Sequence, residues 1–302
     1  MSLQVQFKQF LSENPRWSSA KVAKKLGLSS ATLSLWANGR YQGDNAKIEK
    51  AVGAFLSGQA QAGNVPKDEF EFVRTSVVRD LERAARTAEY GEQMRVVIGA
   101  SGIGKTTAVQ YLAKTVPGVI VVEAYQGMTK KAFMQVIAKQ CGAIPSGGFT
   151  ELFHAVVEAL RGSERLIIID EAEHLPVQAL DAARRIHDFT RCGVLMVGLP
   201  RFYDLLMNRQ RDYGYIYNRT GLPVRLKKLN EDDVKLLVDT VVPCNGYAEV
   251  FLSTSKGIAR DLKTIVFESL RIADENGVSV EDKATFPTIV RKVQQELNRR
   301  EG

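Results

Sequence analysis

Hydrophobic residues follow two different patterns along this chain, and the alternation of these patterns predicts its fold. From residue 67 to residue 224, short apolar runs alternate with segments in which apolar residues recur every three or four positions. The short runs are typical of buried strands, and the longer period is typical of helices that cover a sheet. We therefore predict an α/β fold, with a parallel sheet and helices on both of its faces.

Four apolar runs carry this prediction, and helices are expected between them, for example over residues 130–141 and 150–161. The predicted strands are Val96–Ile98, Val119–Glu123, Leu166–Glu171 and Gly193–Gly198. On either side of this core, residues 67–224, the pattern is only helical. Residues 1–56 are predicted to be an all-α domain, followed by a small, polar, flexible linker at 57–66, and residues 225–302 are predicted to be a helical lid.

The pattern of residues 19–38 is typical of a helix-turn-helix. Gly27 suits the left-handed turn between two helices, and Ser29 is suited to cap the second helix, which is expected to end at Asn38-Gly39. The side chains spaced for a shared core are Val22, Leu26, Leu28, Leu33 and Trp36, with the small Ala23 allowing close packing. A helical hairpin with no DNA-binding role can show the same pattern, so both interpretations stand.

Positive charge is concentrated at the start of the chain. The net charge is +7 over 302 residues, and residues 1–56 carry eight Lys/Arg against three Asp/Glu, a net charge of +5. This excess favours an anionic partner, with double-stranded DNA first, although a basic surface can also serve only solubility. The predicted DNA contacts are Lys21, Lys24, Lys25, Ser30, Thr32, Ser34 and Arg40, possible additional contacts being Asn38, Lys130, Lys131, Lys227 and Lys228.

The segment between the first predicted strand and the next helix matches the pattern G-x-x-x-x-G-K-[ST], and we call it the phosphate loop. Its glycines let backbone amides curl around phosphates, Lys105 places a positive charge against them, and Thr106 offers a hydroxyl to Mg²⁺. The alternative is a glycine-rich turn that opens an ordinary helix. The predicted ATP contacts are Gly99, Ala100, Ser101, Gly102, Ile103, Gly104, Lys105, Thr106 and Thr107.

The third apolar run ends in two carboxylates, Asp170 and Glu171. In this position Asp170 is expected to hold Mg²⁺, and Glu171 to orient and deprotonate the attacking water. An ordinary solvated strand end is the alternative. His174 follows in the same turn, and because no second metal ligand is expected near it, a local structural role is predicted.

Several classes of protein are not favoured by this sequence. No apolar run approaches the length of a membrane span, and the first ten residues do not show a secretory pattern. The cysteines, Cys141, Cys192 and Cys244, lie far apart without C-x-x-C spacing, which is typical of reduced intracellular thiols. A cytoplasmic protein without a disulfide framework or zinc site is therefore expected.

With its sheet order, its Asp170-Glu171 pair and its helical C-terminal region, the chain resembles the AAA+ class of ATPases. The resemblance implies rings or helical filaments in which an arginine of one subunit reaches the nucleotide of its neighbour. It assigns that arginine to Arg219, with Arg209 and Arg211 as rivals, and a nucleotide-contacting lid arginine to Arg260. The alternatives are an ordinary surface charge at Arg219 and a pairing of Arg260 with Asp261 or Glu268. Many members carry a polar residue where this chain has Leu199 after the fourth strand, which implies incomplete water positioning and slow hydrolysis.

Together with the helix-turn-helix, this core resembles the family of ATP-dependent target DNA activators of transposition typified by the phage Mu B protein. The most specific segments are Asn38–Asn45, Gly99–Thr106, Leu166–Leu175 and Gly257–Lys263. The resemblance implies an ATP-bound protein that polymerises on DNA and delivers it to a transposase, which stimulates hydrolysis. A helicase loader or replication initiator of the AAA+ class, and a nucleotide-switched transcription regulator, are the alternatives.

Overall fold

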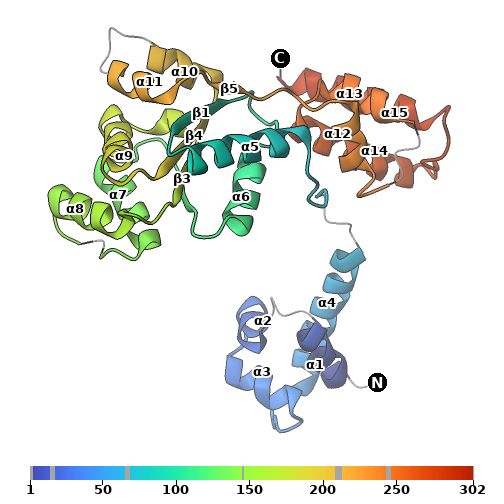
Figure 1. Ribbon diagram of the computed structural model, residues 1–302. Helices are drawn as coiled ribbons and strands as arrows, with labels where there is room; N and C mark the ends of the chain where they lie inside the picture. Colours follow the sequence, from blue (N-terminus) through green and yellow to red (C-terminus); the bar gives the residue numbers. More distant parts are fainter. Residues whose placement is uncertain are drawn as a thin grey trace. The chain divides into compact units, whose positions relative to one another are not determined.

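The computed structural model describes residues 3–13, 18–64, 69–144, 146–207, 213–242 and 246–301. The chain divides into two compact units, Met1–Glu69 and Phe70–Gly302, called here the small unit and the large unit (Figure 1). None of the described helices is long and apolar enough to cross a membrane. Three residues considered above, Arg209, Arg211 and Cys244, lie outside the described part of the chain.

The small unit consists of four helices around an apolar core. They are α1 (Leu3–Glu13), α2 (Ser19–Lys25), α3 (Ser30–Ala37) and α4 (Asn45–Asn64). The two predicted helices of the helix-turn-helix are α2 and α3. Gly27 between them has a left-handed φ of 67°, and the Ser29 side chain accepts a hydrogen bond of 3.0 Å from the Thr32 N–H at the start of α3. Their core contains Val22, Leu33 and Trp36, as predicted.

The last helix of the small unit differs from the prediction. The backbone of α4 remains helical to Asn64, whereas residues 57–66 were expected to be a flexible linker. The physical reason is the repeated Ala and Gln at positions 59–62, since these residues are good helix formers and outweigh the two flanking glycines.

A five-stranded sheet with the order β2-β3-β4-β1-β5 lies at the centre of the large unit, and every neighbouring pair is parallel. The strands are β1 (Met94–Ile98), β2 (Ile120–Glu123), β3 (Leu166–Asp170), β4 (Gly193–Gly198) and β5 (Val224–Arg225). The four predicted strands are all present. The short β5 was not predicted. It extends one residue beyond the expected end of the core at residue 224, because Arg225 still pairs with Ile98 of β1.

Helices cover the sheet in two layers (Figure 1). Alternating residues of the strands pack against one layer or the other. Val97, Ile168 and Leu195 pack with α5 (Ser76–Tyr90) and α6 (Lys105–Thr115). Their sequence neighbours on the strands pack against the opposite layer, which contains α7 (Lys130–Cys141), α8 (Phe149–Leu160), α9 (Val177–Thr190), α10 (Pro200–Met207) and α11 (Gly214–Thr220). The prediction of a parallel α/β core with helices on both faces is confirmed.

The helices of the predicted lid share a continuous core with α5 and α6. They are α12 (Glu231–Val238), α13 (Ala248–Ser255), α14 (Ala259–Glu275) and α15 (Phe286–Glu301). A fully buried carboxylate, Asp233, joins the two parts. It accepts hydrogen bonds from the N–H and the hydroxyl of Ser76, at 2.7 and 2.5 Å, and from the Asn230 N–H at 3.3 Å. One side chain thus caps the start of both α5 and α12.

Candidate nucleotide-binding site

The phosphate loop connects β1 to α6 through two glycines with left-handed backbone conformations. Gly102 has a φ of 75° and Gly104 a φ of 102°, which side-chain-bearing residues rarely adopt. Packing also excludes a side chain at Gly102, since a Cβ there would lie 2.9 Å from Cγ2 of Ile258. Because α6 begins at Lys105, its first amide groups have no partner within the helix, which suits the loop to an anionic ligand.

Lys105 lies almost entirely inside the protein, with 5% of its surface exposed. Its Nζ donates hydrogen bonds to the carbonyl oxygens of Gly99, at 3.1 Å, and Ala100, at 3.0 Å. Burial lowers the pKa of Lys105, while the nearby carboxylates of Glu171, Glu173 and Asp170 act in the opposite direction. The loop therefore holds its ammonium group in place, within the field of three carboxylates.

Asp170 is the last residue of β3 and is 1% exposed. Burial raises the pKa of Asp170, and hydrogen bonds from the Thr106 side chain and the Glu171 N–H, the latter 3.0 Å long, oppose this rise. A hydroxyl from α6 and a carboxylate from β3 therefore meet at the carboxyl edge of the sheet. Oxygen donors of these two kinds fit Mg²⁺, so Thr106 and Asp170 are the residues that would hold it.

Glu171 has a left-handed φ of 52°, a conformation that costs on the order of 1–3 kcal/mol in a residue with a side chain and is concentrated at functional sites. Its carboxylate is half-buried. Burial raises the pKa of Glu171, and the negative charges of Glu173 and Asp170 raise it further. A carboxylate with a raised pKa accepts a proton more readily, as a general base must.

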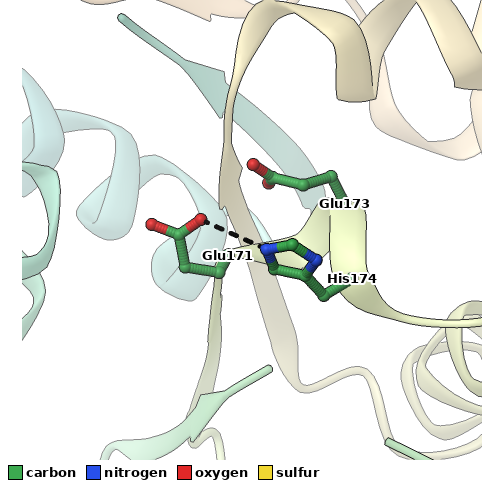
Figure 2. Close-up of side chains that lie close together, drawn as sticks. All are labelled: Glu171, Glu173 and His174. Atoms are coloured by element: carbon green, nitrogen blue, oxygen red, sulfur yellow. Dashed lines mark ion pairs between the residues drawn. The ribbon is translucent and has the colours of Figure 1, made fainter. Parts of the chain in front are cut away.

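The turn after β3 brings three side chains together, as Figure 2 shows. Ligand atoms of Glu171, Glu173 and His174 all lie within 4.8 Å of one another, and His174 Nε2 is 3.9 Å from Glu171 Oε2. The expectation that His174 has no potential ligand near it is therefore wrong. The reason is the 3₁₀ turn at Ala172–His174, which folds the segment back on itself.

Glu173 was not predicted as a site residue. Its Oε2 accepts a hydrogen bond of 3.3 Å from the N–H of Leu199, directly after β4. Gly198 leaves room for this contact, because a Cβ at that position would lie 2.5 Å from the same oxygen. The sequence contains one indication of this role. Glu173 is an acidic residue in the turn after β3, and the neighbouring strand β4 is followed by Leu199, which has no polar side chain.

Comparison with known proteins agrees with this geometry. The family described as AAA domain matches residues 87–206, which contain the phosphate loop, Asp170 and Glu171. This stretch is similar to the AAA domain family. The fold agrees as well: the chain is similar to the ORC2 protein of Aeropyrum pernix, with a TM-score of 0.56 and 17% identity over 75% of this chain and 68% of that one. The predicted AAA+ core is thereby confirmed.

Similarity to transposition proteins extends far beyond the AAA domain. The chain is 27% identical over 275 residues to the ATP-dependent target DNA activator B of Escherichia phage Mu, covering 87% of this chain and 85% of the relative. It is also 27% identical over 241 residues to the Mu-like prophage FluMu DNA transposition protein B of Haemophilus influenzae, covering 78% and 83%. The resemblance to the Mu-type activators is therefore confirmed.

The two arginines assigned from the resemblance, Arg219 and Arg260, lie in different surroundings. Arg260 is the second residue of α14, and its N–H donates a hydrogen bond of 3.0 Å to the carbonyl of Gly102 in the phosphate loop. Arg219 on α11 instead pairs with Asp188 of α9, with Nε 3.2 Å from Oδ1, and 54% of its side chain is exposed. The structure thus brings Arg260, and not Arg219, into contact with the loop of its own chain.

The predicted DNA contacts are mostly exposed, and none of them is tested by the structure. In the small unit, Lys21, Lys25, Ser30, Ser34, Asn38 and Arg40 are exposed, and the side chain of Lys24 lies outside the described part. Thr32 is less available, because its hydroxyl is 2.8 Å from that of Ser29. In the large unit, Lys131, Lys227 and Lys228 are exposed, whereas Lys130 is half-buried with Nζ 3.7 Å from the centre of the Phe149 ring.

Proposed function

We propose that this protein is an ATP-dependent DNA-binding ATPase that assembles on target DNA and delivers it to a transposase. The observation that carries the proposal is the meeting of Lys105, Asp170 and Glu171 at one edge of the sheet, in a chain similar over 87% of its length to a target DNA activator. The buried ammonium suits a triphosphate, and the two carboxylates suit a metal ion and a water molecule.

In the proposed reaction, Lys105 and the first amides of α6 bind the phosphates of ATP. Thr106 and Asp170 would hold Mg²⁺, which would supply positive charge to the phosphate oxygens. Glu171 takes a proton from the attacking water while the water oxygen forms a bond to the γ-phosphorus. The bond from that phosphorus to the β–γ bridging oxygen breaks, leaving ADP and phosphate.

ATP would control DNA binding through assembly. In the proposed filament or ring, Arg219 leaves Asp188 and reaches the γ-phosphate of ATP bound to the neighbouring subunit. There its positive charge neutralises the negative charge of the γ-phosphate in the transition state. The exposed basic residues of the small unit contribute phosphate contacts along the duplex. Because each contact releases counterions, the affinity for DNA should fall steeply as the salt concentration increases.

The test is Glu171→Gln, which keeps the size of the side chain but removes the proton acceptor. We expect kcat for ATP hydrolysis to fall by about 100-fold or more, while ATP-dependent binding to random duplex DNA is retained. Glu158→Gln on α8, with a side chain that is 77% exposed, is the matched control and should leave both unchanged. Equal loss of hydrolysis and DNA binding would contradict the role given to Glu171.

The two other functional classes predict different results. Imaging with ATP and random duplex DNA, combined with footprinting, separates a filament former, which covers any duplex, from a regulator, which protects one defined site. A pull-down with a transposase and with a replicative helicase separates a target DNA activator from a helicase loader. Protection of a single operator would support a transcription regulator instead of the proposed function. Capture by the helicase alone would support a helicase loader.

A further inference from the structure

The end of β4 lacks a polar side chain beside the water-activating carboxylate. Leu199 is half-buried at this point, and an aliphatic side chain cannot accept a hydrogen bond from water. The carboxylate of Glu173 lies at the same place, because its Oε2 accepts a hydrogen bond from the Leu199 N–H. A polar group is therefore present at the end of β4, but it comes from the turn after β3.

The second oxygen of Glu173 has an unusual environment. Oε1 is buried and has no hydrogen-bond partner among the described residues. Burying a carboxylate oxygen without a partner costs about 1–3 kcal/mol or more. Such an atom therefore requires an explanation, such as a catalytic role or a bound water molecule. In Figure 2 the carboxylates of Glu171 and Glu173 lie on the same side of the turn, next to the His174 ring.

The spacing of these carboxylates suits a single water molecule. The ligand atoms of Glu171 and Glu173 lie within 4.8 Å of each other. A water molecule donates its two hydrogen bonds at a near-tetrahedral angle. With about 2.8 Å between the water oxygen and each acceptor, the two acceptor oxygens lie roughly 4.5–5 Å apart. Both carboxylates also lie close enough to Lys105 to influence its pKa, which puts the cluster beside the expected position of the phosphates.

We propose that Glu173 is a catalytic residue that accepts one hydrogen bond from the attacking water while Glu171 takes the other proton. A water that donates both protons to carboxylates directs a lone pair towards the γ-phosphorus. As the new O–P bond forms, the proton passes to Glu171 and the electrons of the breaking bond leave with ADP. This inference rests on the proposed ATPase function. It assigns to Glu173 the hydrogen bond from the attacking water that the side chain of Leu199 cannot accept.

The experiment compares ATP hydrolysis by the full chain with Glu173→Ala, Glu173→Gln and the surface control Glu158→Ala. We expect Glu173→Ala to lower kcat at least about tenfold with KM unchanged. Glu173→Gln, which keeps one acceptor oxygen, should show a smaller loss and serves as the test variant if Glu173→Ala does not fold. Binding of a non-hydrolysable ATP analogue and the thermal unfolding midpoint should equal those of the unchanged protein.

Rescue distinguishes a catalytic contact from a structural one. In the Glu173→Ala background, Leu199→Asn places a polar side chain at the end of β4 and should restore part of kcat. A wild-type kcat in Glu173→Ala, a change in KM alone, or a loss of analogue binding that tracks the unfolding midpoint would overturn the inference. Absence of ATP hydrolysis in the unchanged protein would instead overturn the proposed function, so the two failures are distinguishable.

Discussion

The two units of the chain bury different kinds of side chain. In the small unit, the described residues that are buried are all of hydrophobic type, and Phe7, Leu33 and Trp36 are fully buried. The large unit encloses charged groups as well, among them Lys105, Asp170 and Asp233. Since burying an unpaired charge costs several kcal/mol, each of these groups requires specific partners. The proposed function therefore uses exposed residues outside the core in the small unit, whereas in the large unit it uses buried residues.

This difference predicts opposite results for mutation in the two units. In the large unit, changing a buried charge should remove an activity or a contact between elements. In the small unit, changing a buried apolar residue should affect only folding, whereas the exposed residues predicted to contact DNA should be replaceable without loss of stability.

The largest effect is expected at the phosphate loop. Lys105→Ala removes the positive charge that would meet the phosphates, and we expect ATP-dependent DNA assembly to disappear and hydrolysis to fall about a thousandfold or more. Because the buried ammonium is itself costly, the free energy of unfolding should change little. Filament imaging with ATP and a urea unfolding curve test both statements. Persistence of ATP-dependent filaments would count against the proposed function.

In the small unit, Trp36→Ala should be the most disruptive change. Trp36 is fully buried and contacts the edge of the Phe7 ring, with centroids 6.0 Å apart. Its truncation should cost about 3–5 kcal/mol of the small unit's stability and leave ATP hydrolysis without DNA unchanged. Differential scanning calorimetry and an ATPase assay provide the two readings. Leu35→Ala is the control, since Leu35 is 45% exposed on the same helix. Reduced hydrolysis without DNA would mean that the units are coupled.

Asp233→Ala should destabilise the large unit by about 3 kcal/mol, because it removes the buried acceptor of three hydrogen bonds, two from the half-buried Ser76 and one from the Asn230 N–H. Urea unfolding monitored by circular dichroism measures this loss. The neighbouring Asp232 is exposed on the same helix, and Asp232→Ala should have almost no effect. Similar losses in the two variants would show that the effect comes from helix charge and not from the buried cap.

The smallest effect is expected at the cap of α3. Ser29→Ala removes the oxygen that accepts from the Thr32 N–H and should cost about 1 kcal/mol. Ser30→Ala, one residue later and exposed, should leave stability unchanged and weaken only DNA binding. A thermal unfolding scan of the small unit's transition tests the first expectation, and a DNA titration tests the second.

Features set by adjacent residues were predicted well. The helix over residues 130–141 has the predicted bounds because Thr129 caps it, accepting from the Ala132 N–H, and Gly142 ends it with a φ of 81°. The phosphate loop and β3 likewise follow from short continuous patterns. The resemblance to known ATPases added the positions of Arg219 and Arg260, of which only Arg260 is seen against the loop.

Features set by distant residues were missed. The two residues of β5 are too few to form a periodic pattern, and they are a strand only because β1 lies beside them. Glu173 meets Leu199 because β3 and β4 are neighbours in the sheet, which the order of residues along the chain does not reveal. The helical backbone at 57–64 was missed for another reason, since small polar residues are typical of both linkers and exposed helices.

The large unit cannot be cut between its sheet and its C-terminal helices without uncovering the phosphate loop. The amide of Arg260 and the side chain of Ile258 lie directly against Gly102, although more than 150 residues separate them in the chain. A fragment ending before Asn230 would keep every residue of the loop motif and of the β3 carboxylates, yet lose one side of the loop and the cap of α5. The smallest piece of this chain expected to bind nucleotide therefore extends through α14.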